Sequence, residues 1–122
     1  MPENLVLREG NLLCYKIRTN VLSKDADRLK NEGLCLIGKI FDEQKIKTNV
    51  LIDITEAGIF SLRAQKDWID FLQNENIHRT AIFGGSIVVK MIAHLVMMLA
   101  GRTNVRYFVN KEDAVLWLED WR

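Results

Sequence analysis

The sequence predicts an α/β domain with a mixed, mostly parallel sheet, an N-terminal β-hairpin and about four helices. Short apolar runs at 49–55 and 80–83 are typical of buried strands, which occur in parallel sheets covered by helices, and 105–109 predicts a further strand. Segments with helical spacing of apolar residues lie between these runs, so each pair of strands needs a crossover connection. A length of 122 residues suits one domain, 1–122.

The first third of the chain predicts a hairpin followed by a helix. Strand-like runs at 5–8 and 12–18 flank Glu9-Gly10-Asn11, where Gly and Asn tolerate positive φ. Ser23 is expected to cap the helix that follows. A glycine is costly inside a helix, so Gly33 indicates close packing or a local irregularity. The apolar positions at helical spacing are Ala26, Leu29, Gly33, Leu36, Ile37 and Ile40.

Three further helices are expected, one after each of these three strands. Ser61 is expected to cap a helix that runs to about residue 73. Ser86 and Gly101 are expected to bound an apolar helix over 87–100, and Asn110 to begin the last helix. The residues expected to face inward are Leu62, Trp68, Ile69 and Leu72 on the first of these helices, and Ala114, Trp117, Leu118 and Trp121 on the last.

Composition excludes several classes of function. Seventeen basic and sixteen acidic residues give a net charge of +1, so nothing favours a nucleic-acid partner. Cys14 and Cys35 lie in apolar runs, and no Cys or His residues come in closely spaced pairs, so we expect buried thiols, no metal and no cofactor. The N-terminus lacks a secretory pattern, and a helix over 87–100 would span about 21 Å of the roughly 30 Å needed to cross a bilayer. We therefore expect a cytoplasmic protein without a transmembrane segment.

Four motifs carry a family resemblance. They are Val-Leu-Ile-Asp-Ile-Thr at 50–55, Ala-Ile-Phe-Gly at 81–84, Val-Arg-Tyr-Phe at 105–108, and Ala114 followed by Trp-Leu at 117–118. In this order and spacing the sequence resembles the SpoIIAA-like group of the STAS superfamily, which includes the anti-sigma-factor antagonists. The resemblance extends over roughly the whole chain. It implies a small non-enzymatic regulatory domain that binds a protein partner or, in some relatives, a nucleotide or lipid.

The resemblance also implies a site of phosphorylation. In STAS antagonists a partner kinase phosphorylates a serine at the start of the helix that follows the strand ending in Asp, within a pattern similar to Asp-Ser-Ser-Gly-Leu. This chain has Ile-Phe-Ser-Leu-Arg at 59–63, so only Ser61 falls near the expected position. Ser61 is therefore the candidate phosphorylation site, and its alternative role is that of a plain helix cap. Phosphate at a helix N-terminus would meet a favourable dipole.

Two groups of residues are candidates for binding at the carboxyl edge of the sheet, where open α/β sheets gather ligands. Asp53 lies in an apolar run and must meet a donor, either from the backbone of the loop from Thr55 to Ser61 or from a ligand or partner. Gly84, Gly85 and Ser86 follow the next strand. They predict either a tight turn that brings the next helix close or a small anion site.

The helix over 87–100 carries the third candidate surface. Twelve of the fifteen residues from 86 to 100 are apolar, which leaves little polar face for solvent. We expect this helix to be buried by a neighbouring helix, by a second copy of the chain in a homodimer, or by an apolar ligand. Met91, Leu95 and Met98 are the expected contact residues. The alternative to a protein-binding module is thus a small-ligand or lipid-binding domain. An enzyme is least favoured, because no nucleophile and base are neighbours in the sequence.

Overall fold

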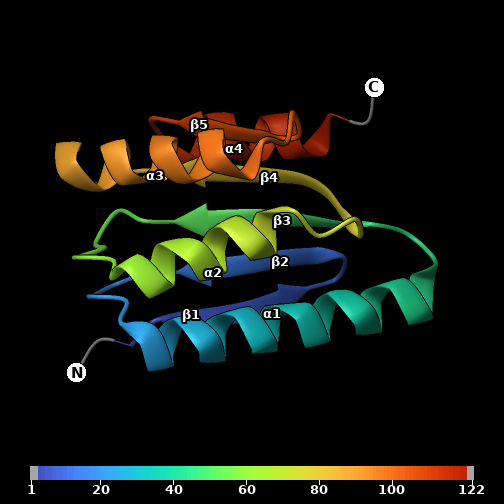
Figure 1. Ribbon diagram of the computed structural model, residues 1–122. Coiled ribbons are helices and arrows are strands. Elements are labelled where there is room, and N and C mark those ends of the chain that lie inside the picture. Colours follow the sequence, from blue (N-terminus) through green and yellow to red (C-terminus); the bar gives the residue numbers. More distant parts are fainter. Residues whose placement is uncertain (1–2, 121–122) are drawn as a thin grey trace.

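The computed structural model describes residues 3–120, which form one sheet and the helices packed on it (Figure 1). The predicted order of a hairpin followed by alternating helices and strands is confirmed. The elements in chain order are β1 (Leu5–Glu9), β2 (Leu12–Lys16), α1 (Ser23–Gln44), β3 (Thr48–Asp53), α2 (Leu62–Leu72), β4 (Ile77–Phe83), α3 (Ile87–Ala100), β5 (Val105–Phe108) and α4 (Lys111–Glu119).

The strands lie side by side in chain order, from β1 to β5. β1 and β2 pair antiparallel as a hairpin, and the three following pairings are parallel. Each parallel pair is joined through a helix, as crossover connections require. The mixed, mostly parallel α/β sheet expected from the sequence is therefore confirmed.

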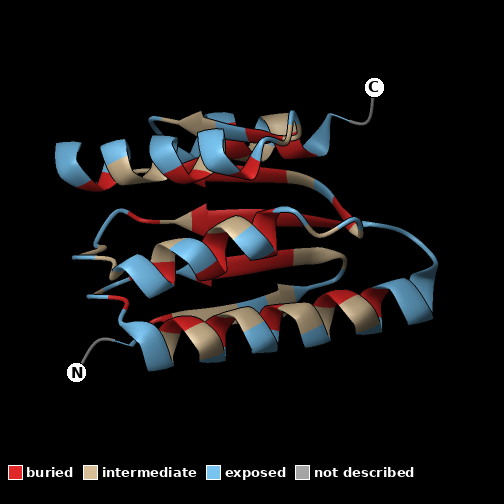
Figure 2. Cartoon of the chain, viewed as in Figure 1, coloured by how far each residue is buried: buried red, intermediate tan, exposed pale blue. Residues whose placement is uncertain are grey.

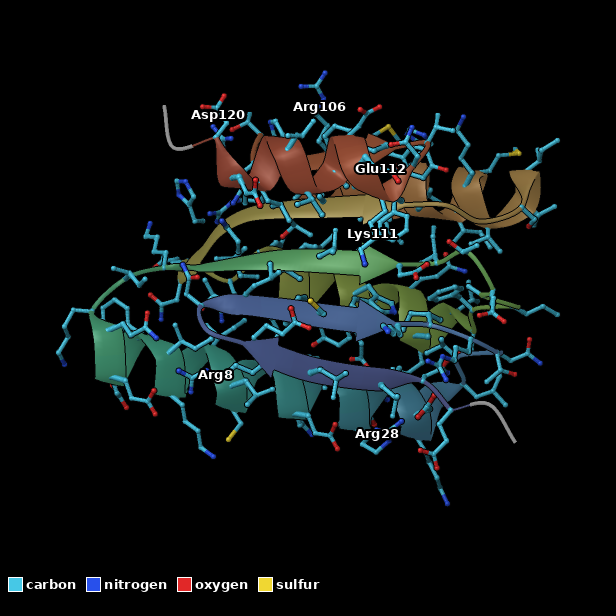
Figure 3. The ribbon with its side chains drawn as sticks, turned by 180° about the vertical axis from the view of Figure 1, so that it is seen from behind. Arg8, Arg28, Arg106, Lys111, Glu112 and Asp120 are labelled. Carbon is cyan, nitrogen blue, oxygen red and sulfur yellow. The ribbon has the colours of Figure 1, made fainter. Side chains whose placement is uncertain are left out.

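The two faces of the sheet are covered unequally. Helices α1, α2 and α3 pack side by side on one face (Figure 1). On the other face α4 lies against β3, β4 and β5, and its apolar residues share a core cluster with Cys14 of β2, whereas no helix lies over β1, as the view from behind shows (Figure 3). The larger core lies under the three helices, and Figure 2 shows their buried residues turned toward the sheet.

Tyr15 of β2 lies at the centre of the larger core. Its ring meets Trp68 and Phe71 of α2 edge to face, with centroids 4.9 and 5.3 Å away. Its hydroxyl donates a hydrogen bond to the carbonyl oxygen of Leu29 at 2.9 Å. A Cβ at Gly33 would lie 1.8 Å from that hydroxyl oxygen, so the expected close packing at Gly33 is confirmed.

Side-chain caps begin three of the four helices of the described chain. The backbone N–H groups of Ala64, Val89 and Asp113 donate to the side-chain oxygens of Ser61, Ser86 and Asn110 at 3.1, 3.3 and 2.9 Å, as expected. The predicted cap at Ser23 is wrong. Leu22 occupies the cap position of α1 without a side-chain hydrogen bond, and Ser23 is already helical.

Two predictions of burial are also wrong. Leu62 is 84% exposed, and Cys35 lies on the outer side of α1. Each is two residues, or about 200° of helical rotation, from buried positions, namely Ala64 on α2, and Gly33 and Ile37 on α1. Leu36 and Trp117 are only partly buried, and the prediction for Trp121 lies outside the described residues.

Candidate functional site

The carboxyl ends of β2 to β5 meet at one edge of the sheet, on the left in Figure 1. Asp53, at the end of β3, is half-buried and accepts a hydrogen bond from the backbone N–H of Thr55 at 2.9 Å. The loop thus supplies a donor for this carboxylate, as one of the two alternatives predicted. The structure brings Asp53, Thr55 and the glycine turn after β4 together at this edge.

The turn after β4 needs both of its glycines. Gly84 and Gly85 have φ of 88° and 90°, which side chains rarely adopt. A Cβ at Gly84 would lie 2.4 Å from the Thr55 hydroxyl oxygen and 3.0 Å from its Cα. The Tyr107 hydroxyl donates to the Gly84 carbonyl oxygen at 2.5 Å. These contacts explain why both positions are glycine: they form a tight turn that packs on the loop after β3.

The loop from Thr55 to Ser61 is held in place by backbone hydrogen bonds. The N–H of Val21 donates to the carbonyl oxygen of Ile59 at 2.8 Å, and the N–H of Ser61 donates to that of Val21 at 3.0 Å. A parallel bridge between Val21 and Phe60 completes this short pairing. The backbone of the loop is therefore fixed against the segment that follows β2.

Asn4 holds the segment 18–20, which follows β2. Nothing in the sequence indicated this role. Asn4 is 2% exposed, and its side-chain oxygen accepts from the N–H groups of Arg18 and Thr19 at 2.8 and 3.2 Å. Its amide nitrogen donates to the carbonyl oxygen of Asn20 at 3.1 Å and to the carboxylate of Asp25 at 2.6 Å. The only signal was a polar residue directly before an apolar strand, which is too common to identify an anchor.

Ser61 lies between two exposed aliphatic side chains. Ile59 is 69% exposed and Leu62, at the first position of α2, is 84% exposed. The Ser61 side chain itself is half-buried, because its oxygen accepts from the first turn of α2. This end of the molecule therefore presents apolar surface on both sides of a hydroxyl group at a helix N-terminus.

Charged groups behind Ser61 join α2 to α1. The buried Asp67 carboxylate lies 3.5 Å from the Lys30 ammonium and 3.8 Å from the Arg63 guanidinium. Burial, together with the neighbouring carboxylate of Asp27, raises the pKa of Asp67 above its usual value. Lys30 therefore gives the Asp67 carboxylate a cationic neighbour across the contact between α1 and α2, while burial still favours the protonated form of that carboxyl.

A shallow polar hollow of about 140 Å³ adjoins Asp53, between Lys16, Arg18 and Glu56. Its mixed charges favour neither an anion nor a cation. Across residues 3–120, no group of three or more His, Cys, Asp or Glu side chains is placed to hold a metal ion. Within the same range, no helix has the length and apolar character needed to cross a membrane.

A small apolar cavity of about 40 Å³ lies between α2, α3 and the sheet. The indole Nε1 of Trp68, which lines it, has no hydrogen-bond partner. The other lining residues are all apolar: Ile52, Ile54, Phe60, Leu72, Ile82, Val89, Ile92, Ala93 and Val96. Met91, Leu95 and Met98 do not line it. They lie on the outer side of α3, away from the carboxyl-edge residues, and are exposed.

Comparison with known proteins identifies the fold. A family model described as SpoIIAA-like matches residues 12–119. An uncharacterised protein of the DUF3478 family from Shewanella loihica PV-4, with a SpoIIAA-like fold, is 22% identical, with 95% of this chain and 92% of that chain covered and a TM-score of 0.66. The anti-sigma factor antagonist SpoIIAA in its unphosphorylated form is 4% identical, with 93% and 94% covered and a TM-score of 0.63. The search of curated proteins gives no match.

Proposed function

The chain belongs to the SpoIIAA-like family, and from this premise we propose that it is a single-domain, non-enzymatic regulatory module that binds a protein partner. The binding surface is the carboxyl edge around the loop from Thr55 to Ser61. The observation that carries the proposal is the pair of exposed aliphatic side chains, Ile59 and Leu62, on either side of Ser61. Two free thiols, at Cys14 and Cys35, suit a cytoplasmic location, where thiols stay reduced.

The ordered loop favours binding to a partner. Because the hydrogen bonds from Val21, Ser61 and Gly58 already fix its backbone, association loses little further conformational freedom. Burial of Ile59 and Leu62 against a partner would remove apolar surface from water, which is the main driving force for association. Asp53, Thr55 and Ser86 lie along the same edge and would supply its polar contacts.

Ser61 would act as the switch of this surface. A phosphate on its hydroxyl would replace the capping hydrogen bond and place negative charge at the N-terminus of α2, where the helix dipole favours it. The same charge would stand between Ile59 and Leu62 and oppose an apolar partner. Mass spectrometry of the protein after incubation with ATP and lysate of its own cell is expected to find phosphate on Ser61. A hydroxyl that stays unmodified under every growth condition would remove the switch.

Binding is tested with substitutions on and off the proposed surface. When it is immobilised, the Leu62→Glu variant is expected to capture at least tenfold less of the partner protein than the unchanged chain captures from its native lysate. Leu116→Glu is the matched control, because Leu116 is a 64% exposed leucine on α4, across the sheet. If both variants captured equally little of the partner protein, or if both captured as much as the unchanged chain, the binding surface would lie elsewhere.

The apolar cavity supports a second candidate function, a small-ligand or lipid-binding domain that uses α3. Val89, Ile92 and Val96 of α3 form one wall, and the lone indole N–H of Trp68 offers a donor. At about 40 Å³ the cavity holds little more than a water molecule, so a ligand would have to displace α3. Native mass spectrometry of gently purified protein would reveal a bound small molecule, and a mass equal to that of the chain alone would disfavour this function.

A further inference from the structure

Helix α3 leaves a stripe of large apolar side chains exposed to solvent. Much of its ribbon is accordingly coloured as exposed in Figure 2. α3 packs on α2 and β5 through its other side, and its buried positions are Val89, Val96 and Ala100. The exposed side chains and their exposed fractions are Ile87 79%, Val88 67%, Met91 66%, Leu95 42%, Met98 70% and Leu99 56%.

The positions in this stripe are symmetric about Ala93. Met91 and Leu95 lie two residues before and after it, Val88 and Met98 five, and Ile87 and Leu99 six. In a two-fold dimer each contact occurs twice, residue i on residue j and residue j on residue i. Two antiparallel copies of α3 that cross at the level of Ala93, whose own side chain lines the cavity on the inner side, would therefore bring each exposed apolar side chain opposite another. The spacing of three, four and three residues from Val88 to Met98 keeps the contacts in one seam.

The charges of α3 fit such a pairing. Lys90 is the only Lys, Arg, Asp or Glu in α3, and its ammonium lies over the Tyr107 ring at 5.3 Å from the centroid, beside the stripe. His94 lies against the same ring at 5.1 Å. The antiparallel arrangement places Lys90 opposite position 96, so the two ammonium groups do not meet, and the helix dipoles oppose. A stripe without charge offers nothing to an acidic, basic or anionic partner and suits a second copy of itself.

Complete burial of the stripe would reach the smallest area that a specific dimer needs. The exposed fractions correspond to roughly four fully exposed side chains, or roughly 500 Å² of apolar surface per chain at about 130 Å² each. Two chains would bury about 1,000 Å², which is the lower bound for a specific interface. We propose that two copies of this chain associate through α3, antiparallel, about a two-fold axis near Ala93. The two carboxyl edges then point to opposite ends of the dimer, so both Ser61 surfaces stay free.

The mass of the protein in solution tests the association. Sedimentation from about 1 to 200 µM is expected to show a transition from the 14.1 kDa chain to twice that mass. Met91→Glu places two carboxylates beside the axis and is expected to raise the dissociation constant at least tenfold, as is Met98→Lys at the end of the stripe. Leu116→Glu and Leu62→Glu should leave the mass unchanged, so a failure here is separate from a failure of the proposed function. Circular dichroism confirms that each variant is folded.

Mixing two variants tests the antiparallel geometry. In the proposed dimer, residue 91 of one chain faces residue 95 of the other. Met91→Glu and Leu95→Lys should each dissociate alone and form a mixed dimer together, whereas parallel helices would place 91 opposite 91. A chain that stays monomeric throughout the concentration range, a dimer indifferent to Met91→Glu, or two variants that never combine would overturn the proposal. If the chain stayed monomeric and the stripe bound an apolar dye, α3 would serve a different apolar partner, and the proposed dimer would also be overturned.

Discussion

Gly33→Ala is expected to destabilise the protein, although alanine is the better helix former. The new Cβ would lie 1.8 Å from the Tyr15 hydroxyl oxygen and 3.0 Å from the ring of Phe71. Tyr15 is 1% exposed and cannot move without losing its hydrogen bond to Leu29. Overpacking costs about 1–3 kcal/mol and the lost buried hydrogen bond about 1–3 kcal/mol, against a gain of about 1 kcal/mol in helix propensity. The net loss should be about 2–4 kcal/mol, or on the order of 10 °C in Tm.

Urea unfolding followed by circular dichroism measures this loss, and the same helix provides its control. Gly38 has no atom within 4 Å of an added Cβ, so Gly38→Ala should gain up to about 1 kcal/mol. In a Tyr15→Phe background the hydroxyl is absent, and Gly33→Ala should cost less than it does beside Tyr15. If Gly33→Ala proved as stable as Gly38→Ala, the account of Tyr15 as a fixed centre of the core would be wrong.

Three further substitutions test the site. Burial and Asp27 raise the pKa of Asp67, so the folded protein holds the proton of this carboxyl more tightly than the unfolded chain does. The stability of the wild type should therefore fall relative to that of Asp67→Asn as the pH rises from 3.8, the usual pKa of an aspartate, toward 7. Parallel stability profiles from pH 3 to 7 would contradict this sign. Asn4→Ala should cost about 2–4 kcal/mol and selectively speed hydrogen exchange at the amides of Arg18 and Thr19, because both lose their acceptor. Gly84→Ala should cost at least about 2 kcal/mol more than Gly101→Ala in the same unfolding assay, because both glycines have positive φ but only Gly84 also meets Thr55; equal losses would mean that the contact is unimportant.

The features predicted from the sequence are those whose partners are close in the chain. Ser61, Ser86 and Asn110 each cap a helix through an N–H three residues on, and Asp53 meets an N–H two residues on. The buried strands were also predictable, because a strand that is covered on both faces has a continuous run of apolar residues.

The features missed depend on residues far apart in the chain. Asn4 binds groups 14 to 21 residues away, and only the hairpin and the start of α1 bring them together. Gly33 signalled close packing, but that its neighbour is Tyr15 follows from where α1 crosses β2. Gly84 meets Thr55 because the register sets Asp53 beside Phe83 across β3 and β4. Leu62 is expected to face inward as part of the apolar face of its helix, yet its exposure is what makes the Ser61 surface apolar.

The unequal covering of the sheet has a consequence for synthesis. Among the described residues α4 follows all five strands in the sequence, and its apolar side chains shield Cys14, Leu51, Ala81 and Phe83 on its face of the sheet. Until residues 111–119 leave the ribosome, a nascent chain can pair its strands and pack three helices while this second apolar face stays exposed to solvent. A message cut short near residue 110 should therefore yield a product that aggregates or meets the cell's proteases, although most of its sheet has formed.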